Sequence, residues 1–516
     1  MRRVAREKSI KKNFIMNAIL TVSNFLFPLI TFPYVSRVLG PDGYGLVNLA
    51  TSVVAYFALF AQLGIPTYGV RAAAKVRDDK EALSRLTQEL FLINLFCSLI
   101  VYAVFFGALF TVPAMRSEKT LYLIMSTQIL FQAIGLEHLY KGLEMYSYIT
   151  IRSLIFKVIG LIGTFLLVKA EKDYAIYGAI TVFATSASAV MNLLHARRVV
   201  DLKLKKNLNL KKHMKEVAIF FAMACATTVY LHLDNVMLGI MKTKTDVGYY
   251  GAAVRIKTIL VSIVTSLGTV LLPRASWYVE KGEMDEFRKV GAKAVRFVWL
   301  FSFPLMIYFM IFAREGILFL SGIKYLDAIL PMQIIMPTLL FIGFSNILGI
   351  QILVPIGREK TVLWSEIAGA VVDLILNAVL IPRYKSAGAA IGTLAAELVV
   401  LLWQAKALSN EERIPVREVF RDLPVFRVLF ASAIGTGAAI WLKWVSLPLW
   451  EDRLMWHNAV ILAVSAACFF PVYYIILLIA KEPMTKEVTD SILGKRKKRQ
   501  QSEKADRKNE RIRKRT

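Results

Sequence analysis

Residues that build disulfides, metal centres and catalytic sites are scarce in this sequence. There are three cysteines, all inside apolar stretches, and five histidines, none spaced as metal ligands usually are. The sequence has no phosphate-binding loop, nucleophile elbow or HExxH motif. These absences argue against a disulfide framework and against an enzyme, and they exclude an ATP-driven pump within this chain. We accordingly expect no cofactor and no bound metal.

Long apolar runs are what the sequence has in excess. Hydrophobic residues make up 56% of the 516 residues, and the mean hydropathy is +0.54. Most runs are about 20 residues long, enough to cross a bilayer core of ~30 Å as a helix. The sequence therefore predicts an all-α polytopic membrane protein with about fourteen transmembrane helices. The predicted spans are residues 13–36, 46–69, 89–112, 120–139, 150–168, 174–194, 216–241, 248–272, 293–313, 328–355, 361–381, 386–407, 424–442 and 457–480.

The charge distribution predicts which ends of these spans face the cytoplasm. The net charge is +27, and with the N-terminus inside, the inner segments carry 46 Lys and Arg against 13 in the outer segments. The positive-inside rule requires such an excess, so both termini are predicted to be cytoplasmic. The basic tail is predicted to be solvated or to contact anionic lipid headgroups. It has no aromatic residues, so we do not expect it to bind nucleic acid.

A glycine-rich stretch, Ser36–Gly45 with the sequence SRVLGPDGYG, separates the first two spans. We expect a tight turn there, because Pro41 fixes φ and both Gly43 and Gly45 permit positive φ. A weaker copy, DVGYYG at Asp246–Gly251, follows about 206 residues later, and two further pairs of short motifs share nearly this offset. The chain is therefore interpreted as a duplication, which in transporters places the substrate site between the halves.

The repeat predicts two lobes of six spans each. Six is an even number, so both lobes would enter the membrane from the same side and be related by an axis along the membrane normal. The predicted domains are a cytoplasmic N-terminus (1–12), an N-lobe (13–194), a basic cytoplasmic linker (195–215), a C-lobe (216–407), two added helices (424–480) and a basic cytoplasmic tail (481–516).

Three segments resemble a known family. They read YVSRVLGPDGYG after the first span, LDNVMLG with VGYYGAAVRIK across spans seven and eight, and LILNAVLIPRYKSAGAAIGTLAAE across spans eleven and twelve. With the fourteen-span plan they resemble the Wzx-type, or RfbX-like, oligosaccharide flippases. These belong to the superfamily that includes the multidrug-and-toxin extrusion (MATE) antiporters and the MurJ lipid II flippases.

The resemblance implies a function in the bacterial plasma membrane. A flippase of this family would pass an undecaprenyl-diphosphate-linked glycan from the inner to the outer leaflet by alternating access, for cell-surface polysaccharide synthesis. Other polysaccharide-assembly proteins are possible partners. Two alternatives within the superfamily are a MATE-like antiporter of cations or drugs and a flippase of the lipid II or sporulation type.

Ionisable residues inside predicted spans are candidates for function, because each costs roughly 2.5–3.5 kcal/mol to insert. Arg255 and Lys257 in span eight are candidate ligands of the substrate diphosphate. Asp234 in span seven lies at a similar depth to Arg255, about 10 Å from the outer surface. The two would form a structural ion pair, or Asp234 would orient the cation or exchange a proton. Arg255 and Lys257 are two positions apart, so at most one of them faces a cavity squarely.

Four further cations are candidates for contact with the anionic head of the substrate. Arg37 and Arg71 flank span two, where topological anchoring is the alternative role. Arg152 and Lys157 begin span five, at the predicted inner entrance to the cavity.

Three carboxylates in spans eleven and twelve are candidates for coupling to H⁺ or Na⁺. Glu366 and Asp373 are seven residues apart and share a helix face, and Glu397 lies in the next span. Hydrogen-bonded structural carboxylates are the alternative.

Overall fold

The computed structural model describes residues 2–203, 208–411, 419–446 and 454–490, which form helices and contain no β-strand. Ten of the described helices are long and apolar enough to cross a membrane, or up to eleven if one bent helix pair counts as a span. An all-α polytopic membrane protein is therefore confirmed. Part of the predicted basic linker (204–207) and the predicted tail beyond residue 490 lie outside the described residues.

Two of the long helices each contain a sharp reversal. Helix α1 (Arg2–Gln62) has 61 residues and breaks at Gly40, where φ is 64°. Helix α16 (Glu359–Ser409) has 51 residues and breaks at Lys385, where φ is 52°. At ~1.5 Å per residue, either would be more than twice as long as a bilayer core is thick. Each therefore supplies two spans. The exact number of fourteen stays a prediction.

The turn predicted after the first span is real, but its conformation was predicted wrongly. The chain reverses at Gly40 alone, the position directly before Pro41, whereas Gly43 and Gly45 are helical. Glycine adopts the left-handed conformation at little cost, and Pro41 has no N–H to leave unpaired at the start of the next helix. The two later glycines serve close packing instead.

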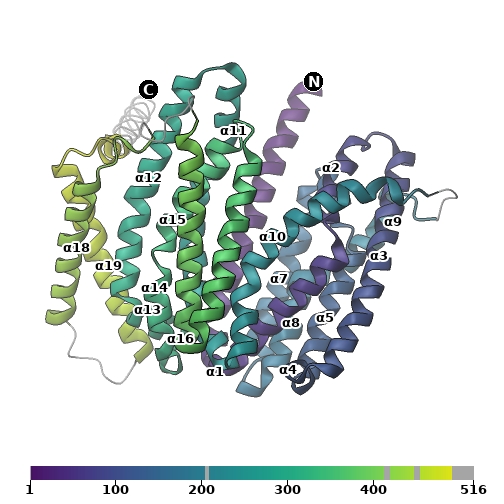
Figure 1. Ribbon diagram of the computed structural model, residues 1–516, viewed down its shortest axis with the longest axis horizontal. Coiled ribbons are helices and arrows are strands. Elements are labelled where there is room, and N and C mark those ends of the chain that lie inside the picture. Colours follow the sequence, from purple (N-terminus) through teal and green to yellow (C-terminus); the bar gives the residue numbers. More distant parts are fainter. Residues whose placement is uncertain (1, 204–207, 412–418, 447–453, 491–516) are drawn as a thin grey trace, which may run out of the picture.

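The helices before the linker form what we call the N-terminal group, drawn in purple to blue in Figure 1. Besides α1, it contains α2 (Ile65–Lys75), α3 (Lys80–Thr111), α4 (Pro113–Ser117), α5 (Lys119–Ile134), α6 (Glu137–Gly142), α7 (Tyr146–Leu167), η1 (Glu171–Asp173), α8 (Tyr174–Ser186) and α9 (Ser188–Val199).

The C-terminal group follows, drawn in teal and green, with two further helices at its outer side in yellow-green (Figure 1). It contains α11 (Lys244–Lys281), α12 (Met284–Ile311), α13 (Ala313–Ser321), η2 (Ile323–Ala328), α14 (Ile329–Ile335), α15 (Thr338–Ser345), η3 (Asn346–Leu353) and α16, and the two further helices are α18 (Val425–Ser446) and α19 (Leu454–Ile479). Helix α10 (Lys211–Met241) runs obliquely between the two groups.

Among the residues that the structure describes, the two groups share a hydrophobic core at one end only. The core joins Phe32, Leu39 and Tyr44 of α1 to buried residues of α11, α13, α14, α15 and α16. We call this the Gly40 end. At the opposite end, which we call the linker end, the N-terminal group has a core around Leu90 and Tyr140, and the C-terminal group has a separate core. The groups are therefore sealed together at the Gly40 end.

Candidate functional site

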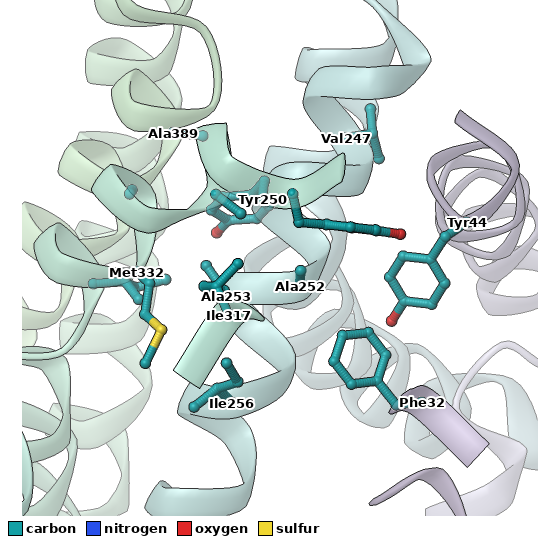
Figure 2. Close-up of a cluster of buried hydrophobic side chains, with 14 of the residues drawn as sticks. Phe32, Tyr44, Val247, Tyr250, Ala252, Ala253, Ile256, Ile317, Met332 and Ala389 are labelled. Atoms are coloured by element: carbon teal, nitrogen blue, oxygen red, sulfur yellow. The ribbon is translucent and has the colours of Figure 1, made fainter. Parts of the chain in front are cut away.

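The seal at the Gly40 end is made by the two copies of the repeated motif. A β-carbon on Gly248 would lie 2.0 Å from the Pro41 carbonyl oxygen, and one on Gly251 would lie 2.3 Å from the Asn48 side-chain nitrogen. The Thr245 hydroxyl donates a hydrogen bond to Asp42 across the same contact. Such closeness is possible only where small residues let two helices approach, as they do in many membrane proteins. Figure 2 shows Tyr44 and Phe32 of α1 facing Ala252 of α11 at this core.

Arg37 is part of the seal. Its guanidinium donates to the carbonyl oxygen of Pro33 at 2.7 Å and also to the carbonyl oxygen of Phe319 in the C-terminal group. Next to it, the Ser36 hydroxyl donates to the Leu320 carbonyl oxygen at 3.1 Å. Arg37 therefore holds the two groups together in this conformation.

Arg255 and Lys257 diverge, in keeping with their two-residue spacing. Arg255 faces the N-terminal group, where its guanidinium bonds the Tyr44 hydroxyl and lies near Tyr177. Lys257 lies near the carboxylates of Asp373 and Glu397 in the C-terminal group. Of Arg255 and Lys257, only Arg255 thus lies at the junction of the two helix groups.

Asp234 is the centre of a buried polar cluster that three helices build. It accepts hydrogen bonds from the Tyr250 hydroxyl on α11, from the Asn377 amide at 2.6 Å, and from the Thr393 hydroxyl at 3.0 Å, both on α16. Tyr250 and Thr393 also bond each other at 2.8 Å. Its partners are thus polar groups of the C-terminal group, and the described residues show no ion pair between Asp234 and Arg255.

Two oxygen atoms of this cluster have no hydrogen-bond partner in the protein. They are Oδ1 of Asp373, which is 2% exposed, and Oδ1 of Asn377, which is fully buried. A β-carbon on Gly392 would lie 2.8 Å and 2.3 Å from these atoms, so both oxygens lie against the backbone of Gly392. Buried acceptors without a donor are costly, and they are rare in native proteins.

The cluster is suited to a small cation. Asp373 and Asp234 are close enough for a hydrogen bond between their carboxyl groups. Two neighbouring buried carboxylates cannot both stay charged without a proton or a cation between them. Carboxylate, amide and hydroxyl oxygens are the ligands that hard cations prefer. The described residues contain no group of three or more His, Cys, Asp or Glu side chains that could hold a metal ion.

Glu397 and Glu366 extend the cluster. Glu397 is 5% exposed and lies near Tyr230 of α10, Lys257 and Glu366. The carboxylates singled out in the sequence are thus brought together, and Lys257 partly balances their charge.

The remaining sequence candidates lie in the N-terminal group and have different surroundings. Lys157 is 8% exposed, and its ammonium donates to the Ser23 hydroxyl at 2.7 Å and to Asn24, which ties α7 to α1. Arg71 is exposed on α2, in a groove at the linker end. Arg152 is buried inside the N-terminal group and lines a cavity there.

Sequence reasoning missed the neutral residues of the cluster. Tyr250, Asn377 and Thr393 supply all three donors to Asp234 through hydroxyl and amide groups, so no formal charge marks them in the sequence. One signal was available, because Asn377 follows Asp373 by four residues and Thr393 precedes Glu397 by four, so each pair shares a helix face.

The first half of α10 is fastened to the N-terminal group. The carboxylate of Glu89, on α3, is buried and accepts from His213 at 2.8 Å, from Lys212 at 2.7 Å and from the Asn209 backbone at 2.8 Å. The Tyr68 hydroxyl bonds the other ring nitrogen of His213 at 2.6 Å. Since Asp234 lies near the other end of α10, one helix connects the linker end of the N-terminal group with the cluster.

Comparison with known proteins agrees with this architecture. The family model described as "Polysaccharide biosynthesis protein" matches residues 10–279, and the model described as "MatE" matches residues 219–379. The "Putative O-antigen transporter" of Escherichia coli (strain K12) is 23% identical over 395 residues, covering 76% of this chain and 95% of that protein.

Two solved structures share the fold. The lipid II flippase MurJ in an inward closed conformation has a TM-score of 0.66 at 17% identity, covering 90% of this chain and 100% of that one. A multidrug resistance MATE family transporter of the MOP superfamily, in an inward-facing conformation, has a TM-score of 0.60 at 15% identity, covering 80% of this chain and 99% of that one.

Proposed function

The chain belongs to the polysaccharide biosynthesis protein family, and on this premise we propose that it is a flippase for lipid-linked oligosaccharide. It moves an undecaprenyl-diphosphate-linked glycan from the inner to the outer leaflet of the bacterial plasma membrane. The glycan then serves the synthesis of cell-surface polysaccharide. The name of the Escherichia coli relative, an O-antigen transporter, supports this substrate class.

The observation that carries the proposal is the one-ended seal. The two helix groups share a core at the Gly40 end and have separate cores at the linker end. We take the groups as the two lobes, and we place the linker end and both termini in the cytoplasm, where the excess of Lys and Arg lies. The structure then corresponds to the inward-facing stage of an alternating-access cycle.

The lipid tail stays in the bilayer during transport. Burying one CH₂ is worth about 0.8 kcal/mol, so drawing a ~55-carbon tail through a polar cavity would cost on the order of 40 kcal/mol. Only the diphosphate and the glycan pass between the lobes, and the gap between the lobes must open sideways to the lipid. No chemical bond changes in this process, so we propose a transporter without enzymatic activity.

Arg255 is the residue we assign to the diphosphate. It lies at the junction of the lobes, where it bonds the Tyr44 hydroxyl and lies near Tyr177. Separation of the lobes would free its guanidinium for a phosphate. The membrane potential, negative inside, adds roughly 4–5 kcal/mol of driving force for two negative charges per 100 mV.

The carboxylate cluster is proposed as the site of a coupled cation, Na⁺ or H⁺. A cation placed between Asp373 and Asn377 would be coordinated by both unpartnered oxygens and would offset the repulsion between the carboxylates of Asp373 and Asp234. Arg37 and Arg71 then act outside the cation site, the former in the seal and the latter at the cytoplasmic surface.

The proposed function is tested by the exposure of lipid-linked glycan on the outer leaflet. Cells without the protein should accumulate the glycan inside, and Arg255→Ala should reproduce most of this defect. Arg116→Ala, at an exposed arginine of α4, is the control and should behave as wild type. If glycan exposure is unchanged without the protein, the proposed function is wrong.

A second candidate function is export of small cations, which the MatE match over residues 219–379 favours. It requires that the protein lower the intracellular level of a cationic dye. Wild-type cells that export the dye but expose glycan independently of the protein would support it.

A further inference from the structure

A second cavity lies inside the N-terminal group, remote in sequence from the carboxylate cluster. It has a volume of about 260 Å³ and lies at the linker end, enclosed by α1, α3, α5, α7 and α9 with the short helices α2 and α6. It reaches the surface beside Glu137, whose side chain is 54% exposed. We call it the Arg152 cavity.

The one buried charge of this cavity is Arg152, and it is unpaired. Arg152 is 6% exposed, and its Nε and Nη1 atoms have no hydrogen-bond partner in the protein. One face of its guanidinium lies 5.5 Å from the Tyr148 ring, while the neighbouring Glu137 is paired with Lys141 at 3.0 Å. Two nitrogen atoms of the guanidinium therefore have N–H groups without an acceptor, and arginine N–H groups bind an oxyanion through charge-assisted hydrogen bonds.

The wall around this arginine also contains the exposed Glu137–Lys141 pair, and its other polar side chains are amide, hydroxyl and imidazole groups. The Oδ1 atoms of Asn94 and Asn192 are buried and have no donor in the protein. The Gln62 amide donates to the Gln132 side chain at 2.6 Å, so this pair presents further amide groups. His138 lies in the same wall, and its Nε2 atom is buried and also has no hydrogen-bond partner in the protein. Arg152 is thus the cavity's buried cation.

The two kinds of unpaired group call for different parts of one ligand. Free amide oxygens repel a second negative charge but accept hydrogen bonds from hydroxyl groups. A bare phosphate or carboxylate would satisfy Arg152 and leave Asn94 and Asn192 unpaired. A ligand with one anionic group and several hydroxyls satisfies all three residues.

We propose that the Arg152 cavity binds a single acidic sugar unit, a hexuronate. Its carboxylate is held by the free N–H groups of Arg152, and its hydroxyls are held by Asn94 and Asn192. The volume lies just below the ~300–1,000 Å³ of ordinary small-molecule sites, which fits one sugar ring rather than an oligosaccharide. The inference rests on the proposed function only for the source of the sugar, the lipid-linked glycan. A free cytoplasmic hexuronate offers the same chemistry.

The direct test is a binding titration of the purified full-length protein, followed by saturation-transfer NMR. The probes are D-glucuronate, D-galacturonate, neutral D-galactose and inorganic phosphate. A hexuronate should bind at least about tenfold more tightly than galactose or phosphate, because each of these lacks one set of hydrogen bonds. Equal binding of galactose or of phosphate, or no binding of either hexuronate, would overturn the proposal.

Variants of the cavity locate the site. Arg152→Gln should weaken hexuronate binding about 10–100-fold, and Asn94→Ala should weaken it less, as expected for a charged and a neutral hydrogen-bond partner. Arg152→Lys, which keeps the charge but loses the fork, provides the test if Arg152→Gln does not fold. Arg116→Gln is the matched control. Binding that survives in both cavity variants would place the site elsewhere and overturn the proposal.

Transport measurements separate this inference from the proposed function and identify the source of the sugar. Arg152→Gln should slow translocation of a glycan that contains a hexuronate more than translocation of a neutral glycan. If the wild type binds hexuronate but translocates no glycan, the proposed function fails and the cavity assignment stands, with a free hexuronate as the ligand. If the wild type translocates both glycans but does not bind hexuronate, the proposed function stands and the cavity assignment fails.

Discussion

The backbone of Gly45 lies directly against that of Lys244, so that a β-carbon on Gly45 would be 1.9 Å from the Lys244 carbonyl oxygen. Gly45 is on α1 in the first copy of the repeated motif, and Lys244 begins α11 two residues before the second copy. The contact closes the seal at the Gly40 end, and it tolerates no side chain. Opening and closing of the Gly40 end therefore depend on backbone contact between the two copies.

Gly45→Ala should open this seal. The added methyl group overlaps backbone rather than a flexible side chain, and overpacking of this kind costs about 1–3 kcal/mol. The population of the sealed conformation should fall by about tenfold or more relative to the open one. Spin labels at the exposed residues Arg116 and Ile323, one on each helix group, would report this as longer distances.

A matched control for Gly45→Ala exists in α18. A β-carbon on Gly437 would have no neighbour within 4 Å, so Gly437→Ala should leave the distances between the spin labels unchanged. An unchanged distance distribution in Gly45→Ala itself would show that the seal does not require the contact with Lys244.

Asp234→Asn should abolish coupling at the carboxylate cluster. The substitution removes one of the two neighbouring carboxylates and leaves the Tyr250 and Thr393 hydroxyls with a weaker acceptor. We expect glycan transport to fall at least about tenfold and to lose its dependence on Na⁺ or pH, as for the loss of a charged partner. Asp285→Asn, at a residue whose side chain is 86% exposed, is the control. Normal, ion-dependent transport by Asp234→Asn would contradict the assignment.

Lys157→Met should affect stability more than transport. The ammonium group bonds Ser23 and Asn24 on α1, so its loss leaves two acceptors unpaired at a cost of about 1–3 kcal/mol. We expect a lower unfolding temperature in detergent and glycan transport close to wild type per folded molecule. The reverse pattern, normal stability without transport, would restore Lys157 as a substrate ligand.

Glu482 should make the attachment of the last two helices dependent on pH. It follows α19, accepts from Arg296 of α12 at 2.6 Å and bonds the Thr485 backbone and hydroxyl. Burial alone would raise the pKa of this carboxyl group, but the Thr485 hydrogen bonds and the Arg296 charge outweigh it and lower the pKa. A lowered pKa stabilises the folded protein above the carboxyl pKa of the unfolded chain, and this contribution is lost as the pH falls through the folded value.

The Glu482 prediction is checked by unfolding temperatures across pH. The unfolding temperature of the wild type should exceed that of Glu482→Gln near pH 7. The difference between the two temperatures should shrink below about pH 4.5, near the usual pKa of a glutamate. Glu487→Gln, at a residue whose side chain is 63% exposed, should show little difference at any pH. A gap between wild type and Glu482→Gln that stays constant down to pH 3 would contradict the prediction.

The sequence predicted the fold well because bilayer thickness imposes a length on every span. It also identified Asp234, Asp373 and Glu397, since charges inside apolar runs are conspicuous. It could not predict the partners of Asp234, because Asn377 and Thr393 are more than 140 residues away and neutral. The hydrogen-bond partners of Lys157 were likewise hidden, since only the packing of α7 on α1 places Ser23 and Asn24 within its reach.

Helix α10 connects the N-terminal group to the C-terminal group. The hydrogen bonds of Glu89 fix one end of α10 to the N-terminal group, and the Asp234 cluster fixes the other end to the C-terminal group. A helix attached at both ends allows the two helix groups to rotate relative to each other but restricts their translation. Any displacement at the cluster must therefore bend α10, tilt it or strain the hydrogen bonds of Glu89. The length and stiffness of this single helix thus limit how far the two helix groups can move.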